Sequence, residues 1–114
     1  MPHVPSMTYV RVEWRHSFPT EPVTIYSELD EHRWEVRKVE VFPDGSFGYA
    51  SKRAETPSTG LGLVPFPPPA EIAEDPAFDP VEITADEFEK MWRIALDTLQ
   101  LSSVGKPGPD DREP

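Results

Sequence analysis

The segment YSELDEHRWEVRKVEVFPDGSFGYAS, residues 26–51, decides the predicted fold because strand and turn patterns alternate along it. A strand begins near Arg33, and the phase of its alternating apolar residues switches at Arg37–Lys38, which predicts a β-bulge there. Phe42–Ser46 (FPDGS) is a turn sequence whose glycine can adopt positive φ, and Phe47–Ser51 returns as the next strand. The segment therefore predicts neighbouring antiparallel strands.

Two earlier strands alternate between apolar and polar residues, over Thr8–His16 and Val23–Asp30. This period of two is typical of a strand with one buried face. The predicted inward side chains are Val10, Val12, Trp14, His16, Val23, Ile25, Ser27 and Leu29, and the predicted outward ones are Tyr9, Arg11, Glu13, Arg15, Thr24, Tyr26, Glu28 and Asp30.

A polar and proline-rich connection follows the fourth strand. Lys52–Gly60 reads as a loop, and Leu61–Val64 reads as a short fifth strand. Pro65–Pro69 holds four prolines, which exclude a ladder strand or a helix interior. We expect an extended surface connector there; a polyproline ligand for an SH3-like domain is the alternative.

The clearest helix signal begins at Thr84. The sequence Thr84–Glu87 (TADE) is a capping box, with Thr84 as N-cap and Glu87 at N3. An apolar stripe at spacings of three and four residues follows it, made of Phe88, Met91, Trp92, Ala95, Leu96 and Leu99. We therefore expect a helix over Thr84–Leu99 that packs on the apolar face of the sheet.

Together these elements predict an α+β fold: a single antiparallel β-sheet of four to five strands with a C-terminal α-helix packed on one face. A chain of 114 residues suits one small domain. We predict this domain over residues 7–101, with a disordered lead over 1–6 and a disordered tail over 102–114 that is rich in Gly, Pro and Asp.

Composition limits the possible functions. The chain has no cysteine, which excludes disulfides and thiolate catalysis and fits a cytoplasmic location, and no apolar run is long enough for a membrane helix. The net charge is −10, and residues 55–101 carry ten acidic against two basic side chains. Such a domain repels phosphate backbones, so we expect no nucleic-acid or membrane partner. It would attract a basic protein, although solubility alone also explains the charge.

The sequence offers little catalytic chemistry. Its three histidines are scattered, so we predict no metal site and no cofactor. Four acids of the central strands could include a pair for acid–base work, but nothing fixes two of them at a useful separation (Glu28, Asp30, Glu35 and Glu40). We assign no catalytic residue, and enzymatic activity stays an open alternative.

His16 and Trp34 are the candidates for a pocket, with Arg37 near its rim. His16 lies on the inward phase of the first strand, so it could act as a base or a pH-sensitive contact at the mouth of the sheet. The structural alternative is a histidine that caps the core edge and bonds to the backbone.

The central run mixes both signs of charge with aromatic side chains, and aromatic residues and arginine are enriched at interface hot spots. The predicted partner-binding residues are Tyr26, Glu28, Asp30, Glu31, Arg33 and Arg37. A solvated sheet face, stabilised weakly by exposed ion pairs, is the alternative interpretation. The acidic segment Glu71–Asp79 is the rival surface for a basic partner.

The chain resembles a family of small bacterial proteins that share a domain of unknown function. The strings VEWRHSFPTEPVTIYSELD, RWEVRKVEVFPDGSFGYAS, LGLVPFP and ITADEFEKMW carry this resemblance, which covers Met7–Leu96. It implies kinship and supplies no catalytic residue. Proteins of this kind are suspected to be immunity partners of toxins, so the resemblance implies a partner such as a basic toxin.

Two functional hypotheses follow from the sequence. The first is a non-catalytic protein-binding domain, of an immunity or inhibitor type, that masks a basic partner. The second is a small ligand-binding or enzymatic domain with a pocket between sheet and helix. A deep pocket containing His16 would favour the second hypothesis. The sequence does not determine the oligomeric state.

Overall fold

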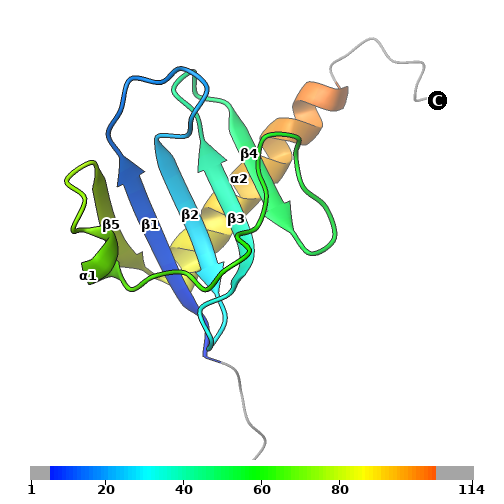
Figure 1. Ribbon diagram of the computed structural model, residues 1–114. Helices are drawn as coiled ribbons and strands as arrows, with labels where there is room; N and C mark the ends of the chain where they lie inside the picture. The colour runs from blue at the N-terminus through cyan, green and yellow to red at the C-terminus, as the bar shows by residue number, and fades with distance from the viewer. Residues whose placement is uncertain (1–5, 105–114) are drawn as a thin grey trace, which may run out of the picture.

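The computed structural model describes residues 6–104, with side chains up to Leu99, as a five-stranded antiparallel sheet and two helices (Figure 1). The strand order is β4-β3-β2-β1-β5, and the α+β fold is the predicted one. The elements are β1 (Thr8–Trp14), β2 (Thr24–Leu29), β3 (Glu35–Val41), β4 (Phe47–Ser51), α1 (Pro69–Ile72), β5 (Phe78–Ile83) and α2 (Ala85–Val104).

The strand registers separate the two faces of the sheet. On one face, Val10 lies opposite Ser27 and Val12 lies opposite Ile25. On the other face, Tyr9 is paired with Glu28, which is in turn paired with Arg37 of β3. Along β1 and β2 the first face is therefore mostly apolar, whereas the second mixes aromatic and charged side chains.

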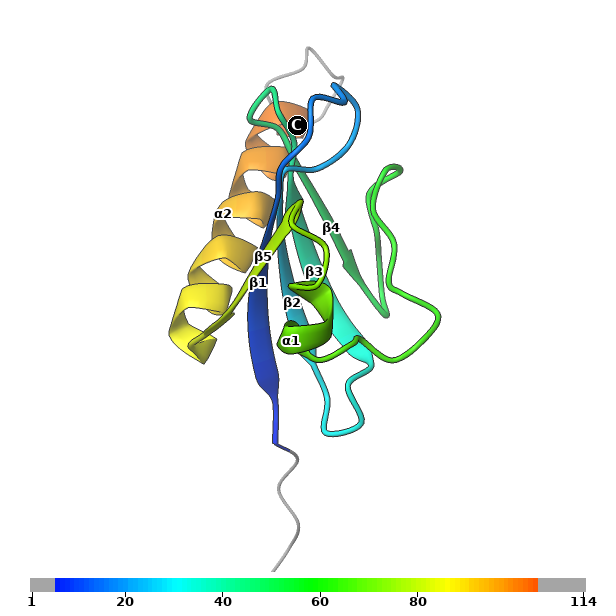
Figure 2. The ribbon, with the colours of Figure 1, turned by 60° about the vertical axis from the view of Figure 1, so that its left-hand side comes forward.

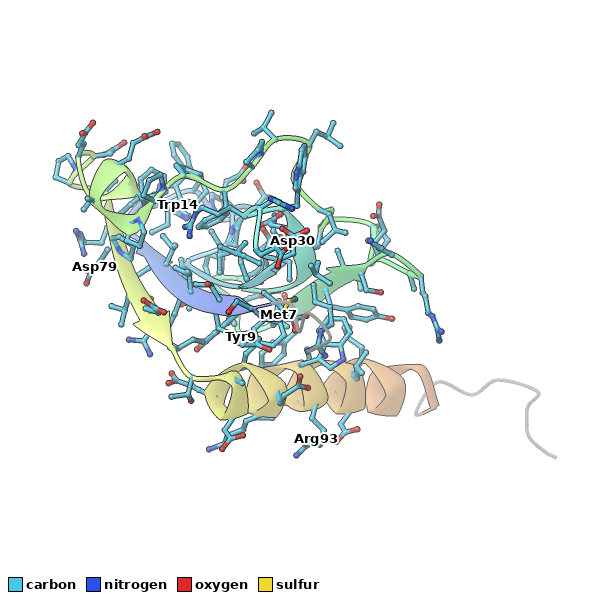
Figure 3. The ribbon with its side chains drawn as sticks, turned by 90° about the horizontal axis from the view of Figure 1, so that it is seen from below. Met7, Tyr9, Trp14, Asp30, Asp79 and Arg93 are labelled. Atoms are coloured by element: carbon cyan, nitrogen blue, oxygen red, sulfur yellow. The ribbon has the colours of Figure 1, made fainter. Side chains whose placement is uncertain are left out.

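Helix α2 covers the second face and not the apolar one, so the predicted choice of face is wrong. The ring of Phe88 lies 5.5 Å from that of Tyr9, and Trp92 contacts Tyr49 edge-on. Figure 3 shows Tyr9 between the sheet and α2, with Arg93 pointing away from the sheet. The aromatic side chains that sequence periodicity assigns to solvent therefore form the contact with the helix.

The predicted start of α2 is confirmed, because the Glu87 amide donates to Thr84 Oγ1 over 3.1 Å. The Glu87 carboxylate accepts a hydrogen bond from Arg11 of β1, which ties the start of the helix to the sheet. The helix continues to Val104, beyond the predicted end at Leu99, so residues 102–104 of the predicted tail are helical. Residues 1–5 of the predicted lead (1–6) and residues 105–114 of the predicted tail lie outside the described residues.

The apolar face is covered by residues 58–77, which we call the strap and which include α1. Figure 2 shows the strap and α2 on opposite sides of the sheet. Three partly buried side chains of the strap and β5 pack against the buried cluster of Val10, Val12 and Leu29, namely Phe66, Ile72 and Phe78. The sheet is thus the middle of three layers.

The fifth strand lies elsewhere than predicted. Residues Leu61–Val64 form no strand, and the outer place beside β1 is taken by Phe78–Ile83. Pro80 conceals this strand in the sequence, but a proline is compatible with an edge strand, which needs only one row of ladder hydrogen bonds. The predicted bulge is present about one residue earlier than expected, because the β2–β3 register shifts between Glu28 and Leu29, opposite Glu35–Arg37.

Candidate binding site

The predicted binding residues Glu28 and Arg37 lie beneath α2. The Arg37 guanidinium donates from Nε to Glu28 Oε1 over 2.5 Å and from Nη2 to Glu28 Oε2 over 3.1 Å. It also donates to Glu89 of α2, and its Cζ lies 5.0 Å from the ring centroids of both Phe88 and Trp92. The arginine therefore links β2, β3 and α2 through ionic and cation–π contacts.

The expected exposure of Glu28 is wrong, because its relative exposure is only 6 %. The Tyr9 hydroxyl also donates to this carboxylate, and Tyr26 is half-buried on the same face. Hydrogen bonding to Glu28 raises the pKa of Arg37, and the hydrogen bond from Arg37 lowers the pKa of Glu89. Because α2 packs here, this network joins the helix to the sheet and leaves Glu28 buried.

The predicted residues of the β2–β3 turn divide into two groups. Arg33 adopts a positive φ of 68°, and its guanidinium donates to the main-chain oxygens of Phe66 and Pro67 in the strap. Asp30 accepts hydrogen bonds from the amides of His32 and Trp34, and these bonds lower its pKa, with that from Trp34 the larger cause. Arg33 is therefore used internally.

Glu31 is exposed on this turn, and its carboxylate lies 3.5 Å from the ring of His32. Asp30 is half-buried and shapes the turn through its amide hydrogen bonds. Of the six predicted partner-binding residues, Glu31 is the one that is exposed, although the same turn contacts the strap through Arg33.

His16 has the geometry of the structural alternative. Its Nε2 lies 2.8 Å from the Pro22 oxygen, and its Nδ1 accepts a hydrogen bond from the Phe18 amide. The ring packs against Trp14, with 4.3 Å between centroids. Because Nδ1 accepts a hydrogen bond, Nε2 carries the proton and donates to the oxygen, so both nitrogens are occupied by the backbone.

Charged residues of β3 hold the strap on the opposite face. Glu35 Oε1 accepts hydrogen bonds from the Gly62 amide over 2.6 Å, and it lies 3.0 Å from Lys38 Nζ. Lys38 also donates to the Gly60 oxygen, and Thr59 Oγ1 donates to Glu40 over 2.8 Å. Burial raises the pKa of Glu40. The strap is therefore tied to the sheet along much of its length.

A pocket of about 390 Å³ opens between the sheet, α1 and the start of β5. Four charged side chains contribute to its lining, of which Glu35 and Lys38 are paired and Glu71 and Asp75 belong to exposed residues. The apolar lining consists of Val12, Ile25, Phe66, Pro67, Ile72 and Phe78. The result is an apolar hollow with acids from the strap beside it.

The pocket described above is not the one expected between sheet and helix. His16, Trp34 and Arg37 do not line the hollow, which lies on the face opposite α2. The sequence signal for the real lining is the set of isolated apolar residues in the proline-rich connection, Phe66, Ile72 and Phe78. Their role depends on the path of the strap, which local periodicity does not encode.

Within residues 6–104, no three side chains among His, Cys, Asp and Glu gather as a metal site would require. In the same range, no helix combines the length and the hydropathy needed to cross a membrane.

A protein-family model described as a domain of unknown function (DUF6881) matches residues 8–97. This match includes all five strands, the strap and most of α2. No curated protein and no solved structure matches the chain significantly.

Proposed function

We propose that this chain, which belongs to the DUF6881 family, is a non-catalytic protein-binding domain that recognises a basic partner. The observation that supports this most directly is the apolar pocket lined in part by Glu71 and Asp75. An apolar centre with a charged edge is the usual anatomy of a protein interface. Six of the ten residues that line the pocket belong to residues 55–101, the part of the chain that carries the excess of acidic side chains.

The proposal moves the contact surface from the β2–β3 turn to the strap. Glu28, Arg33 and Arg37 are committed to contacts within the fold, as their hydrogen bonds show. By contrast, Glu71, Glu74 and Asp75 are exposed on and just after α1. Electrostatic attraction by exposed acids speeds the encounter with a basic partner and adds less to final affinity.

An immunity-type or inhibitor protein that masks a basic site is the specific form of this proposal. In a bacterial host, which the sequence resemblance implies, the partner would be a basic toxin and the complex would form in the cytoplasm. The acid excess over residues 55–101 supports such masking, since it complements a positively charged site.

A small-ligand-binding domain is the second candidate. Its support is the pocket volume of about 390 Å³, within the ~300–1,000 Å³ typical of small-molecule sites. A small ligand would need mostly apolar surface, and its binding would depend weakly on salt.

The test begins with capture of a partner by the immobilised chain from its host, followed by purification of that partner. Association kinetics are then measured at low and high salt for the wild type and for Glu71→Gln/Asp75→Asn. Asp86→Asn/Asp97→Asn is the matched control, because it removes two exposed charges from α2. We expect the on-rate to fall with salt and to fall further in the strap variant than in the control. A salt-independent on-rate, or equal effects of both variants, would contradict the proposal.

A further inference from the structure

We infer that the pocket receives one apolar side chain of the partner, flanked in the partner's sequence by lysine or arginine residues that pair with Glu71 and Asp75. This inference rests on the proposed function and specifies the chemistry of the segment that is recognised. The bound segment would lie across the strap with its anchor between Phe66, Ile72 and Phe78.

The interior of the pocket favours an uncharged anchor. Its two charged residues on the sheet already neutralise each other, with 3.0 Å between Lys38 Nζ and Glu35 Oε1. Their side chains are only 14 % and 4 % exposed, so an incoming charge would have to compete with bonds that are already made. An aliphatic or aromatic side chain instead gains from contact with the apolar walls.

The edge of the pocket favours basic flanks. Glu71, Glu74 and Asp75 lie within about one helical turn of chain and all are exposed. One cation is close to them, since Arg15 donates to the Pro76 oxygen, but the three acids outnumber it. Lys38 is held inside by Glu35 and Gly60. An acidic segment would therefore be repelled, whereas lysine or arginine on either side of the anchor would be attracted.

The strap also presents apolar surface outside the pocket, which indicates a polypeptide as the occupant. Leu63 is 89 % exposed and Val64 is 70 % exposed. They precede Phe66 in the chain, so they lie within about 10 Å of the pocket wall. Exposed apolar patches of this kind mark interaction sites. A ligand confined to the hollow would leave both residues in water, whereas an extended segment can cover them.

The strap is pre-organised for this contact. Arg33, Glu35, Lys38 and Glu40 bind it at Phe66–Pro67, Gly62, Gly60 and Thr59 respectively. A partner therefore does not have to order the strap, and this reduces the entropic cost of association.

The test uses seven-residue peptides of lysine and arginine with leucine, phenylalanine or serine at the centre. Binding to the full chain is followed by amide chemical-shift changes in NMR titrations at low salt. We expect the leucine and phenylalanine peptides to shift the signals of Phe66, Ile72 and Phe78. They should bind about tenfold or more tightly than the serine peptide, since burying such a side chain is worth about 1.5–3 kcal/mol. Equal affinity of all three peptides would overturn the anchor.

Two variants separate this inference from the proposed function. Ile72→Trp fills the pocket, and we expect it to reduce binding of the leucine peptide to the level of the serine peptide. Leu63→Ser/Val64→Ser alters exposed residues only, so the fold should be retained while the affinity for the purified partner falls. One outcome is that Glu71→Gln/Asp75→Asn is the only one of the three variants that lowers the affinity for the purified partner. In that case the inference of an apolar anchor in the pocket is wrong and the proposed function stands. If no variant changes partner binding, both the proposed function and the inferred anchor are wrong. If Ile72→Trp does not fold, the peptide series on the wild type decides.

Discussion

Arg37→Met is expected to destabilise the contact between the sheet and α2 strongly. The substitution keeps a long side chain between Phe88 and Trp92 but removes the charge and both hydrogen bonds to Glu28. Glu28 is 6 % exposed, so its carboxylate would remain buried without the Arg37 charge, while it still accepts the hydrogen bond from the Tyr9 hydroxyl. Removing one partner of a buried ion pair costs about 3–5 kcal/mol. That is a large part of the total stability of a small domain.

A matched set of variants isolates the cause of this loss. Glu89 also binds Arg37, but its side chain is 42 % exposed, so Glu89→Gln should cost less than about 1 kcal/mol. Glu28→Gln combined with Arg37→Met removes both charges of this pair and keeps an acceptor for Tyr9. This double variant should therefore recover a substantial part of the stability that Arg37→Met loses, because apolar replacements of buried pairs are often tolerated.

The assay is equilibrium unfolding in urea, followed by circular dichroism and by tryptophan fluorescence. Urea is uncharged and leaves the ion pairs unscreened, unlike guanidinium chloride. The reasoning fails if Arg37→Met unfolds within 1 kcal/mol of the wild type. It also fails if Glu89→Gln costs as much as Arg37→Met, because the exposed pair would then carry the stabilisation.

Three further predictions concern separate parts of the fold. Thr84→Ala should cost about 0.5–2 kcal/mol in urea unfolding because it removes the N-cap acceptor for Glu87, whereas Thr84→Ser should be nearly neutral. Gly48→Ala should cost about 1–3 kcal/mol, because its Cβ would lie 2.1 Å from Thr59 Oγ1 and push the strap away from β4; an unchanged melting temperature would contradict this packing. Burial raises the pKa of Glu40 in the folded state, so the wild type loses stability as this carboxyl ionises. Glu40→Gln should therefore gain stability relative to the wild type as pH rises from about 4 to 7. A difference in unfolding free energy that stays constant across this range would refute the prediction.

The elements of the fold could be predicted from the sequence largely because their signals are local. The N-cap at Thr84 and the turn glycine, Gly45 with φ of 86°, each depend on a few neighbouring residues, and the structure confirms both. The β-bulge is also a local signal, since it corrects a phase error within β3. By contrast, β5 carries Pro80 and two acids, and its strand character comes from pairing with β1, which lies far away in sequence. Local propensity cannot report such a pairing.

The acids of the candidate site lie in the segment Glu71–Asp79, which the sequence offers as the rival surface, but its apolar pocket could not be predicted. Strand alternation alone gives no reason to cover both faces of the sheet. Alternation along β1 and β2 identifies Val10 and Val12 as inward, which is correct, but it labels Tyr9 and Tyr26 as outward. In a three-layer domain both sets are inward, and the aromatic side chains are long enough to meet α2.

The charged run of β3 is the signal that distinguishes a sheet covered on both faces from a sheet with one solvated face. A solvated face needs no particular order of charges, whereas here Arg37 binds α2 while Glu35, Lys38 and Glu40 bind the strap. The bulge between Glu35 and Arg37 places these neighbours on opposite faces. A strand that carries charges on both faces beside an apolar centre therefore favours two covering layers. In this chain the strap, which has only the short helix α1, forms one of these layers. It leaves a pocket open against the sheet and exposes Leu63 and Val64.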